Sequence, residues 1–330
     1  MTNLLVPVSY NGQGTDATLA HITREAILAA QKHGDVAAVV VGHPGTAAAL
    51  QQALSVAEVV RIYAAEADDA LLSLGITETD VISKIAVENS CDGIILPDSV
   101  LNREIAGRLA ARLGSGIAGD VVGLTEPATV THSIFGSQLD VTATVRGRTP
   151  IILLRNGVVE VPDREETSAQ KTNLADIEQV DIPRGGNARS VRVTSMTPEE
   201  ATDRPNLTTA KIVVAGGRGV GSAENFVTLV EALADQLGAA VGATRDAVDL
   251  NYCAGACQIG QTGVTVNPEL YIGLGISGAI QHKAGMQNAK RIVVVNNDPE
   301  APLFSIADLG IVGDVTEVVP ALLDLLQSNA

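Results

Sequence analysis

The chain alternates short apolar runs with longer stretches of helical periodicity, and this alternation decides its fold class. Residues 36–42 are almost continuously apolar, which is typical of a parallel strand buried on both faces. Strands that alternate with helices indicate a doubly wound α/β layer. In the first half we expect strands at 4–9, 36–42, 58–63 and 93–96, and helices at 15–33, 46–54, 77–90 and 102–113.

The pattern changes after residue 115. Short β runs rich in Thr and Val, at 116–124 and 129–154, predict an antiparallel end to the first domain. The polar, acidic stretch at 162–186 has little periodicity, so we interpret it as a linker or an excursion over the surface. The 330 residues are about twice the common domain size. We therefore predict two domains, each a mostly parallel sheet flanked by helices: an N-terminal domain over 1–190, a linker over 191–210 and a C-terminal domain over 211–330.

A glycine-rich turn opens the second domain. An apolar run at 212–215 leads directly into Gly216-Gly217-Arg218-Gly219, and a helix is expected over 223–237. This layout holds a phosphate, because glycines allow close approach and helix amides and an arginine meet the charge. The spacing is not G-x-G-x-x-G, and the strand expected at 239–243 ends at Thr244 instead of an acidic residue that would bind a ribose. This departure argues against an NAD-dependent dehydrogenase.

The densest group of candidate residues lies between 258 and 298. A turn at 260–263 precedes an apolar strand expected at 270–274, and a second turn at 275–278 leads into a helix expected over 279–286. The unpaired amides at the start of this helix would form an anion site, with His282 in or just after its first turn. A further apolar run at 291–295 ends at Asn296. In an open α/β sheet, ligands lie outside the carboxyl ends of the strands, which is where these segments converge.

Composition excludes several classes of partner. The net charge is −16, so nucleic acid and anionic membrane surfaces are poor partners. No apolar run reaches the roughly 18 residues that span a bilayer, and no basic leader with a long apolar core opens the chain. We therefore expect a cytoplasmic protein without membrane insertion. Cys91, Cys253 and Cys257 are odd in number and sparse, which predicts free thiols and no metal site.

The segment ELYIGLGISGAIQHKAGMQNAKRIVVVNND, at residues 269–298, closely resembles the signature of the electron transfer flavoprotein alpha subunit. The segment NREIAGRLAARLGSGIAGDVVGL, at 102–124, is similar to the N-terminal domain of the same family, so the resemblance covers essentially the whole chain. It implies that the C-terminal domain is a Rossmann-like FAD-binding domain. From the residues we also predict that the N-terminal domain serves assembly and binds no cofactor, because its glycine-containing loop at 9–15 has no basic residue to neutralise a phosphate.

The resemblance further implies which residues surround FAD. Arg218 and amides near Ser277 would face the pyrophosphate, and Arg245, Thr262 and His282 would contact the ring and influence electron transfer. The implied cofactor-binding residues are Arg218, Thr244, Arg245, Ile259, Gly260, Gln261, Thr262, Ser277, Gly278, Ala279, Ile280, Gln281, His282, Asn296, Asp314 and Val315.

The function implied by the resemblance is that of an electron carrier and not of a substrate-converting enzyme. As the alpha subunit of a heterodimer with a beta subunit, the chain would pass electrons from flavoprotein dehydrogenases, such as acyl-CoA dehydrogenases, to a membrane quinone oxidoreductase. Two alternatives stay open: a dinucleotide-dependent dehydrogenase and a non-enzymatic nucleotide-binding module. A visible spectrum separates them, because a bound flavin is yellow and the nucleotides are colourless.

Overall fold

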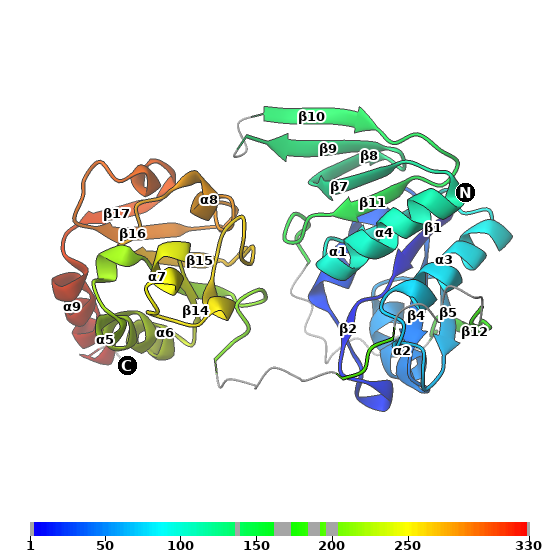
Figure 1. Cartoon of the computed structure of the whole chain (residues 1–330), viewed down its shortest axis with the longest axis horizontal. Helices are drawn as coiled ribbons and strands as arrows, with labels where there is room; N and C mark the ends of the chain where they lie inside the picture. The colour runs from blue at the N-terminus through cyan, green and yellow to red at the C-terminus, as the bar shows by residue number, and fades with distance from the viewer. Residues whose placement is uncertain (1–2, 136–138, 162–172, 184–191, 196–203, 329–330) are drawn as a thin grey trace. The chain divides into compact units, whose positions relative to one another are not determined.

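The computed structural model describes residues 3–135, 139–161, 173–183, 192–195 and 204–328. The chain divides into two compact units, Met1–Pro198 and Glu199–Ala330 (Figure 1). Each unit contains a parallel sheet flanked by helices, which confirms the predicted fold class. The predicted limits of the linker stay a prediction, because part of 191–210 lies outside the described residues.

A parallel sheet forms the centre of the first unit. Its strands are β1 (Asn3–Pro7), β4 (Asp35–Gly42), β5 (Arg61–Glu66), β6 (Gly93–Pro97), β7 (Ile117–Val121), β11 (Ile151–Leu154) and β12 (Asp176–Gln179). Their order is β12-β5-β4-β1-β6-β11-β7, and every neighbouring pair is parallel. The chain starts in the middle of the sheet, so the order reverses beside β1.

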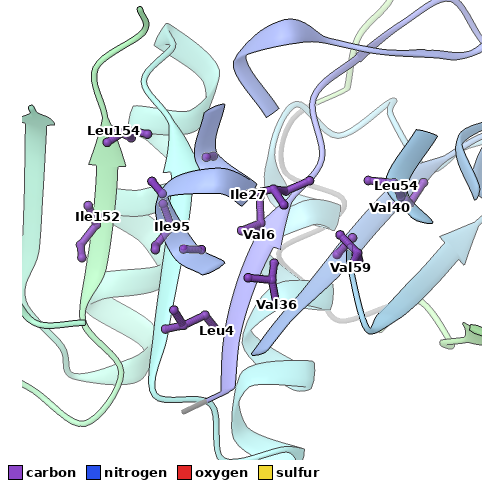
Figure 2. Packing of buried hydrophobic residues seen from close by; sticks show 14 of the residues in the cluster. Leu4, Val6, Ile27, Val36, Val40, Leu54, Val59, Ile95, Ile152 and Leu154 are labelled. Atoms are coloured by element: carbon purple, nitrogen blue, oxygen red, sulfur yellow. The ribbon is translucent and has the colours of Figure 1, made fainter. Parts of the chain in front are cut away.

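Helices cover both faces of this sheet. They are α1 (His21–Gln31), α2 (Thr46–Val56), α3 (Ile76–Glu88) and α4 (Val100–Leu113). Successive residues of a strand point to opposite faces, so Leu4 and Val6 pack against α1 and α2, whereas Leu5 packs against α3 and α4. Figure 2 shows Val6 beside Ile27 of α1, with Leu4 further along the same strand. Burial on both faces explains why these strands are almost continuously apolar.

The antiparallel end predicted for this unit is only partly present. The strands β8 (Gly123–Glu126), β9 (Thr129–Ile134) and β10 (Leu139–Thr144) do form an antiparallel sheet. The prediction is wrong for β7 and β11, which are parallel strands of the main sheet. The four residues of β11 are all buried, and a strand buried on both faces fits the sheet between β6 and β7.

Two further expectations for the first unit are corrected. The predicted helix at 15–33 is interrupted, because β3 (Thr18–Leu19) pairs with β2 (Tyr10–Asn11) and α1 begins only at His21. The Thr23 hydroxyl donates to the Ser9 carbonyl at 2.8 Å and accepts from its amide at 2.9 Å, which closes the intervening loop. The interval interpreted as a linker contains the edge strand β12, parallel to β5.

The second unit has a smaller parallel sheet. Its strands are β13 (Ile212–Gly216), β14 (Ala240–Ala243), β15 (Leu270–Leu274), β16 (Ile292–Asn296) and β17 (Leu309–Val312). Their order is β14-β13-β15-β16-β17, and all neighbouring pairs are parallel. The order reverses between β13 and β15, as in the flavodoxin-type arrangement of doubly wound sheets. A ligand crevice is therefore expected where these two strands end.

The two faces of this sheet are covered differently. The helical segments are α5 (Ala223–Asn225), a π-helical turn (Phe226–Glu231), α6 (Ala232–Leu237), α7 (Arg245–Asp249), α8 (Ile280–Lys283) and α9 (Val315–Ser328). The π-helical turn, α6 and α9 pack on one face. On the other, buried residues of loops and short turns, such as Ile259, Val266 and Leu303, pack around Tyr271. The helix predicted at 279–286 is the much shorter α8.

No helix in the described ranges is long and apolar enough to cross a membrane. The three cysteines are free thiols, as expected, with Cys91 buried and Cys253 and Cys257 half-buried.

Candidate functional site

A cavity of about 390 Å³ lies in the second unit where the parallel strands end. The loops that follow β13, β14, β15 and β16 form its wall, together with the turn at 258–262. This is the crevice at which the strand order reverses. The residues in the wall that had been predicted as cofactor-binding are Arg218, Thr244, Arg245, Ile259, Gly260, Gln261, Thr262, Ser277, Gly278, Ala279, Gln281, His282 and Asn296.

Three predicted residues do not line the cavity: Ile280, Asp314 and Val315. The Ile280 side chain is 74% exposed. The Asp314 carboxylate accepts from the Thr316 amide at 2.8 Å and from its hydroxyl at 2.7 Å, so it caps the start of α9. Val315 is buried in the core beneath that helix. These side chains are thus used in local structure in this geometry, and the predicted contacts with FAD stay a prediction.

The prediction of site residues missed several members of the wall: Gly217, Gly219, Asp246, Gln258, Gly275, Ile276, Asn297 and Asp298. Most of them neighbour a predicted residue in the same turn, so the sequence contained a positional signal. Asp246 and Asp298 are different, because a pattern of glycines and arginines gives no reason to expect carboxylates in an anion site.

Glycines bring two loops of the cavity together. The loop after β15 crosses the loop after β13 so closely that a Cβ on Gly275 would lie 2.6 Å from the carbonyl carbon of Gly219. Gly275 also has a φ of +61°, a conformation that side-chain-bearing residues rarely adopt. Gly219 in turn donates its amide to the Gly275 carbonyl at 3.0 Å. Only glycines fit this crossing, which forms the floor of the cavity.

Backbone amides point to an anion site in the loop after β15. Among the described hydrogen bonds, the amides of Ser277, Gly278 and Ala279 donate to no backbone carbonyl. Successive free amides of this kind bind phosphate oxygens. The helix that follows, α8, has only four residues, so its dipole adds little and the loop itself supplies the donors. The predicted anion site at a helix start thus becomes a site in a loop.

Two arginines line the same cavity as these amides. The Arg218 guanidinium is 3.6 Å from the Asp246 carboxylate, and the Arg245 guanidinium is 3.5 Å from that of Asp249. Both arginine side chains are largely exposed, at 74% and 68%. Exposed ion pairs of this kind contribute at most about 1 kcal/mol to stability. Both guanidinium groups can therefore bind an anionic ligand at little energetic cost.

Two hydroxyl groups of the cavity can each donate a hydrogen bond to a ligand. Thr244 accepts from the Ala247 amide at 3.3 Å and caps α7. Thr262 accepts from the Gln258 side-chain amide at 2.8 Å. A hydroxyl that accepts one hydrogen bond can still donate its own proton. Thr244 and Thr262 therefore present donors at two positions of the wall.

The side chain of Asn296 holds two segments of the cavity wall together. Its side-chain amide donates to the Ile276 carbonyl at 2.9 Å, and its side-chain oxygen accepts from the Asp298 amide at 3.0 Å. The side chain is buried, and both of its polar ends have partners within the protein. Asn296 thus holds the loop after β15 against the end of β16, and its predicted contact with FAD stays a prediction.

His282 is buried at the cavity and has a partner at each ring nitrogen. Nε2 lies 2.7 Å from the Tyr271 hydroxyl, and Nδ1 lies 3.1 Å from the Ile259 carbonyl. Burial lowers the pKa of His282 to about 4, so the ring is neutral near pH 7. A neutral ring has only one proton, and the Ile259 carbonyl holds it. The ring therefore has no free proton to donate to a ligand in this geometry, and its predicted contact with the flavin ring stays a prediction.

The fold and the cavity define a class of protein, an α/β protein with a dinucleotide site. Glycine loops, free amides and two arginines suit a pyrophosphate, and hydroxyl and amide groups suit polar ring atoms. No group of three His, Cys, Asp or Glu side chains in the described ranges could hold a metal ion.

Comparison with known proteins gives the family. An electron transfer flavoprotein domain matches residues 9–183, and an electron transfer flavoprotein FAD-binding domain matches residues 206–287. The chain is 48% identical to the electron transfer flavoprotein subunit alpha of Mycobacterium leprae over 96% of both chains. It is 36% identical to that of Paracoccus denitrificans over 91% of this chain and 93% of the relative. With that of Bacillus subtilis the identity is 35% over 94% of both.

The chain belongs to the electron transfer flavoprotein alpha-subunit family, as its signature segment predicted. The matched FAD-binding domain, at 206–287, contains the loops after β13, β14 and β15, and FAD is the cofactor. Alpha subunits of this family pair with a beta subunit and act in electron transfer. The cavity fits FAD, because it offers free amides and guanidinium groups for the pyrophosphate and leaves no Cβ in the way at the loop crossing.

Proposed function

We propose that this chain binds FAD in the cavity at the ends of β13 and β15 and, together with a beta subunit, carries electrons from flavoprotein dehydrogenases, such as acyl-CoA dehydrogenases, to a membrane quinone oxidoreductase. The observation that carries this proposal is the crossing of two glycine loops beside Arg218 and three free amides, within the span matched by the FAD-binding domain. An electron carrier of this kind needs no acid–base pair of its own. We propose the cytoplasm as its compartment.

Each part of the wall has a separate task in this proposal. Arg218 and the amides of 277–279 hold the pyrophosphate, because they are the cationic and donor groups that converge on the loop crossing. Arg245 and Thr262 lie along the ring, where a cation and a hydroxyl donor stabilise negative charge. When bound, FAD supplies a ring that accepts and releases electrons. The protein's own groups orient that ring and set the charge around it.

The beta subunit has a direct task in this proposal. No aromatic side chain other than His282 lines the described cavity, although Tyr271, Tyr252, Phe226 and Phe304 belong to the same unit. Tyr271 and Phe226 are fully buried in the two cores. The described wall therefore offers no tyrosine, phenylalanine or tryptophan ring to stack on a flavin, and a surface of the beta subunit would complete it.

Gly275→Ala tests the site. The added Cβ would meet the backbone of Gly219 and push the two loops apart, so we expect FAD affinity to fall by at least tenfold. Gly238→Ala is the matched control, because Gly238 has a similar φ of +60° in the same unit but nothing lies within 4 Å of its Cβ position. Both variants share the backbone strain, and only Gly275→Ala adds the clash.

FAD binding is measured by quenching of flavin fluorescence on co-expressed alpha and beta subunits. The proposed site is supported if the parent and Gly238→Ala proteins are both yellow and FAD binding is weakened only in Gly275→Ala. Equal binding by both variants would place FAD elsewhere. A colourless parent that binds NAD or an adenine nucleotide would favour the dehydrogenase or the nucleotide-binding module instead.

A further inference from the structure

Tyr271 is a buried polar group that the proposed FAD contacts do not use. It lies on β15 in the centre of the second sheet, and its side chain is fully buried. It does not line the cavity. Its hydroxyl nevertheless lies 2.7 Å from Nε2 of His282, a ring that does line the cavity. A buried hydroxyl next to a site can act through the group that it contacts.

The partners fix which nitrogen of His282 carries the proton. The Ile259 carbonyl can only accept, so Nδ1, 3.1 Å away, must donate to it. In the neutral ring Nε2 then has a lone pair, and the Tyr271 hydroxyl donates to that lone pair. Desolvation raises the pKa of Tyr271, so the phenol keeps its proton. The three groups thus form one directed chain of hydrogen bonds from Tyr271 through His282 to Ile259.

This chain of hydrogen bonds connects the central strand to the turn that contains Gln261 and Thr262. The turn also rests on α8 and the residues after it, because the Gln261 amide donates to the Gln281 carbonyl at 2.8 Å. A Cβ on Gly285 would lie 2.4 Å from the Gly260 amide nitrogen, so the two backbones are in direct contact. The His282 ring between β15 and Ile259 is therefore the side-chain contact that acts beside these backbone contacts in positioning the turn.

We propose that Tyr271 is a positioning residue of the cavity. Its hydroxyl donates to Nε2 and so orients the His282 ring, which the Ile259 carbonyl keeps protonated at Nδ1. His282 in that orientation helps to hold the turn whose Gln261 and Thr262 face the ligand. Tyr271 itself touches no ligand. This inference rests on the proposed function, because the ligand that benefits is FAD.

Tyr271→Phe removes only the hydroxyl and leaves the ring in the core. The control is Tyr252→Phe, which removes a hydroxyl that donates to the Gly221 carbonyl at 2.9 Å in the same unit. Neither Tyr252 nor Gly221 lines the cavity, and neither contacts His282. The first measurement is ¹⁵N NMR of the His282 ring in flavin-free protein, assigned by comparison with His282→Gln. The parent and Tyr252→Phe should show a proton on Nδ1 and a bare Nε2. In Tyr271→Phe, the Nδ1 proton should exchange with solvent at least tenfold faster.

The second measurement is the dissociation constant for FAD with the beta subunit present. It should rise about tenfold in Tyr271→Phe and stay unchanged in Tyr252→Phe. A merely structural role would lower the melting temperature of Tyr271→Phe without changing the exchange of the Nδ1 proton, and that result would overturn the proposal. Faster exchange of the Nδ1 proton with unchanged FAD binding would overturn it as well.

Two outcomes do not depend on the behaviour of the variants. A proton on Nε2 in the parent protein would overturn the proposal even if Tyr271→Phe fails to fold. If the parent itself does not bind FAD, the proposed function fails and the inference fails with it. That case is distinguishable, because the parent and Tyr252→Phe then lack binding as well.

Discussion

Glu25→Gln should remove a pH dependence from the stability of the first unit. Glu25 lies on α1 with 2% of its surface exposed. Its carboxylate accepts from the Gly157 amide at 2.6 Å, and the amides of Val158 and Val159 also donate to it. Burial nevertheless outweighs these donors and raises the pKa of Glu25 from 4.5 to about 7. A buried carboxyl group with such a pKa is neutral in mildly acidic solution.

The sign and size of the effect follow from the two pKa values. A group whose pKa is higher in the folded state contributes stability that is fully present below the unfolded value of 4.5 and is lost as the pH rises through about 7. At about 1.36 kcal/mol per pH unit, the span between the two values corresponds to about 3 kcal/mol. Glutamine has the same shape and no titration. The parent should therefore lose up to about 3 kcal/mol between pH 5 and pH 8 relative to Glu25→Gln.

The assay is hydrogen exchange of the full-length chain, which reports each unit separately. Protection of α1 and of the amides at 157–159 is compared at the two pH values after correction for the intrinsic rates. Glu88→Gln, an exposed carboxyl at the end of α3, is the control and should follow the parent. Parallel pH profiles for the parent and Glu25→Gln would refute the reasoning, because they would show that burial does not raise the pKa of Glu25.

Two further predictions concern the second unit. Arg245→Ala should weaken FAD binding and lower the potential at which the bound flavin takes its first electron by roughly 60 mV, the one-electron equivalent of a tenfold effect. Spectroelectrochemical titration measures this potential, with a substitution of the exposed Arg291, Arg291→Ala, as the control. Equal potentials in Arg245→Ala and the parent would contradict the prediction. Cys257 should be alkylated before Cys91 and Cys253 near pH 7, because a hydrogen bond from Cys253 lowers its pKa, whereas burial raises that of Cys91. In Cys253→Ala that alkylation, followed by mass spectrometry, should slow by about tenfold, and an unchanged rate would rule out the thiol pair.

Strands buried on both faces could be predicted from the sequence, and edge elements could not. The run at 36–42 is apolar because helices cover both faces of β4. A continuous apolar run therefore predicts a strand in the interior of the sheet. The edge strand β12, with the residues DIEQ, is largely exposed and has no such pattern. It is found only through its parallel pairing with β5, a long-range contact that local periodicity does not contain.

The candidate site divides in the same way. The glycine turns after β13 and β15 were predictable, because close approach and positive φ restrict the residue type. The partners of polar side chains were not. Tyr271 and His282 are separated along the chain and meet only in the folded core, and Asp314 turns to the start of α9. The sequence places His282 near a turn, but only the fold shows which groups contact its two ring nitrogens and therefore which nitrogen carries the proton.

The pairing of each cavity arginine with a carboxylate of α7 has a consequence for cofactor binding. The Asp246 and Asp249 carboxylates lie 3.6 and 3.5 Å from the Arg218 and Arg245 guanidinium groups, so each arginine has an anionic partner before a ligand arrives. Because such exposed pairs contribute at most about 1 kcal/mol, they leave both arginines able to turn to a ligand. When a pyrophosphate binds, each arginine exchanges one anionic partner for another, and the released carboxylates are hydrated by water.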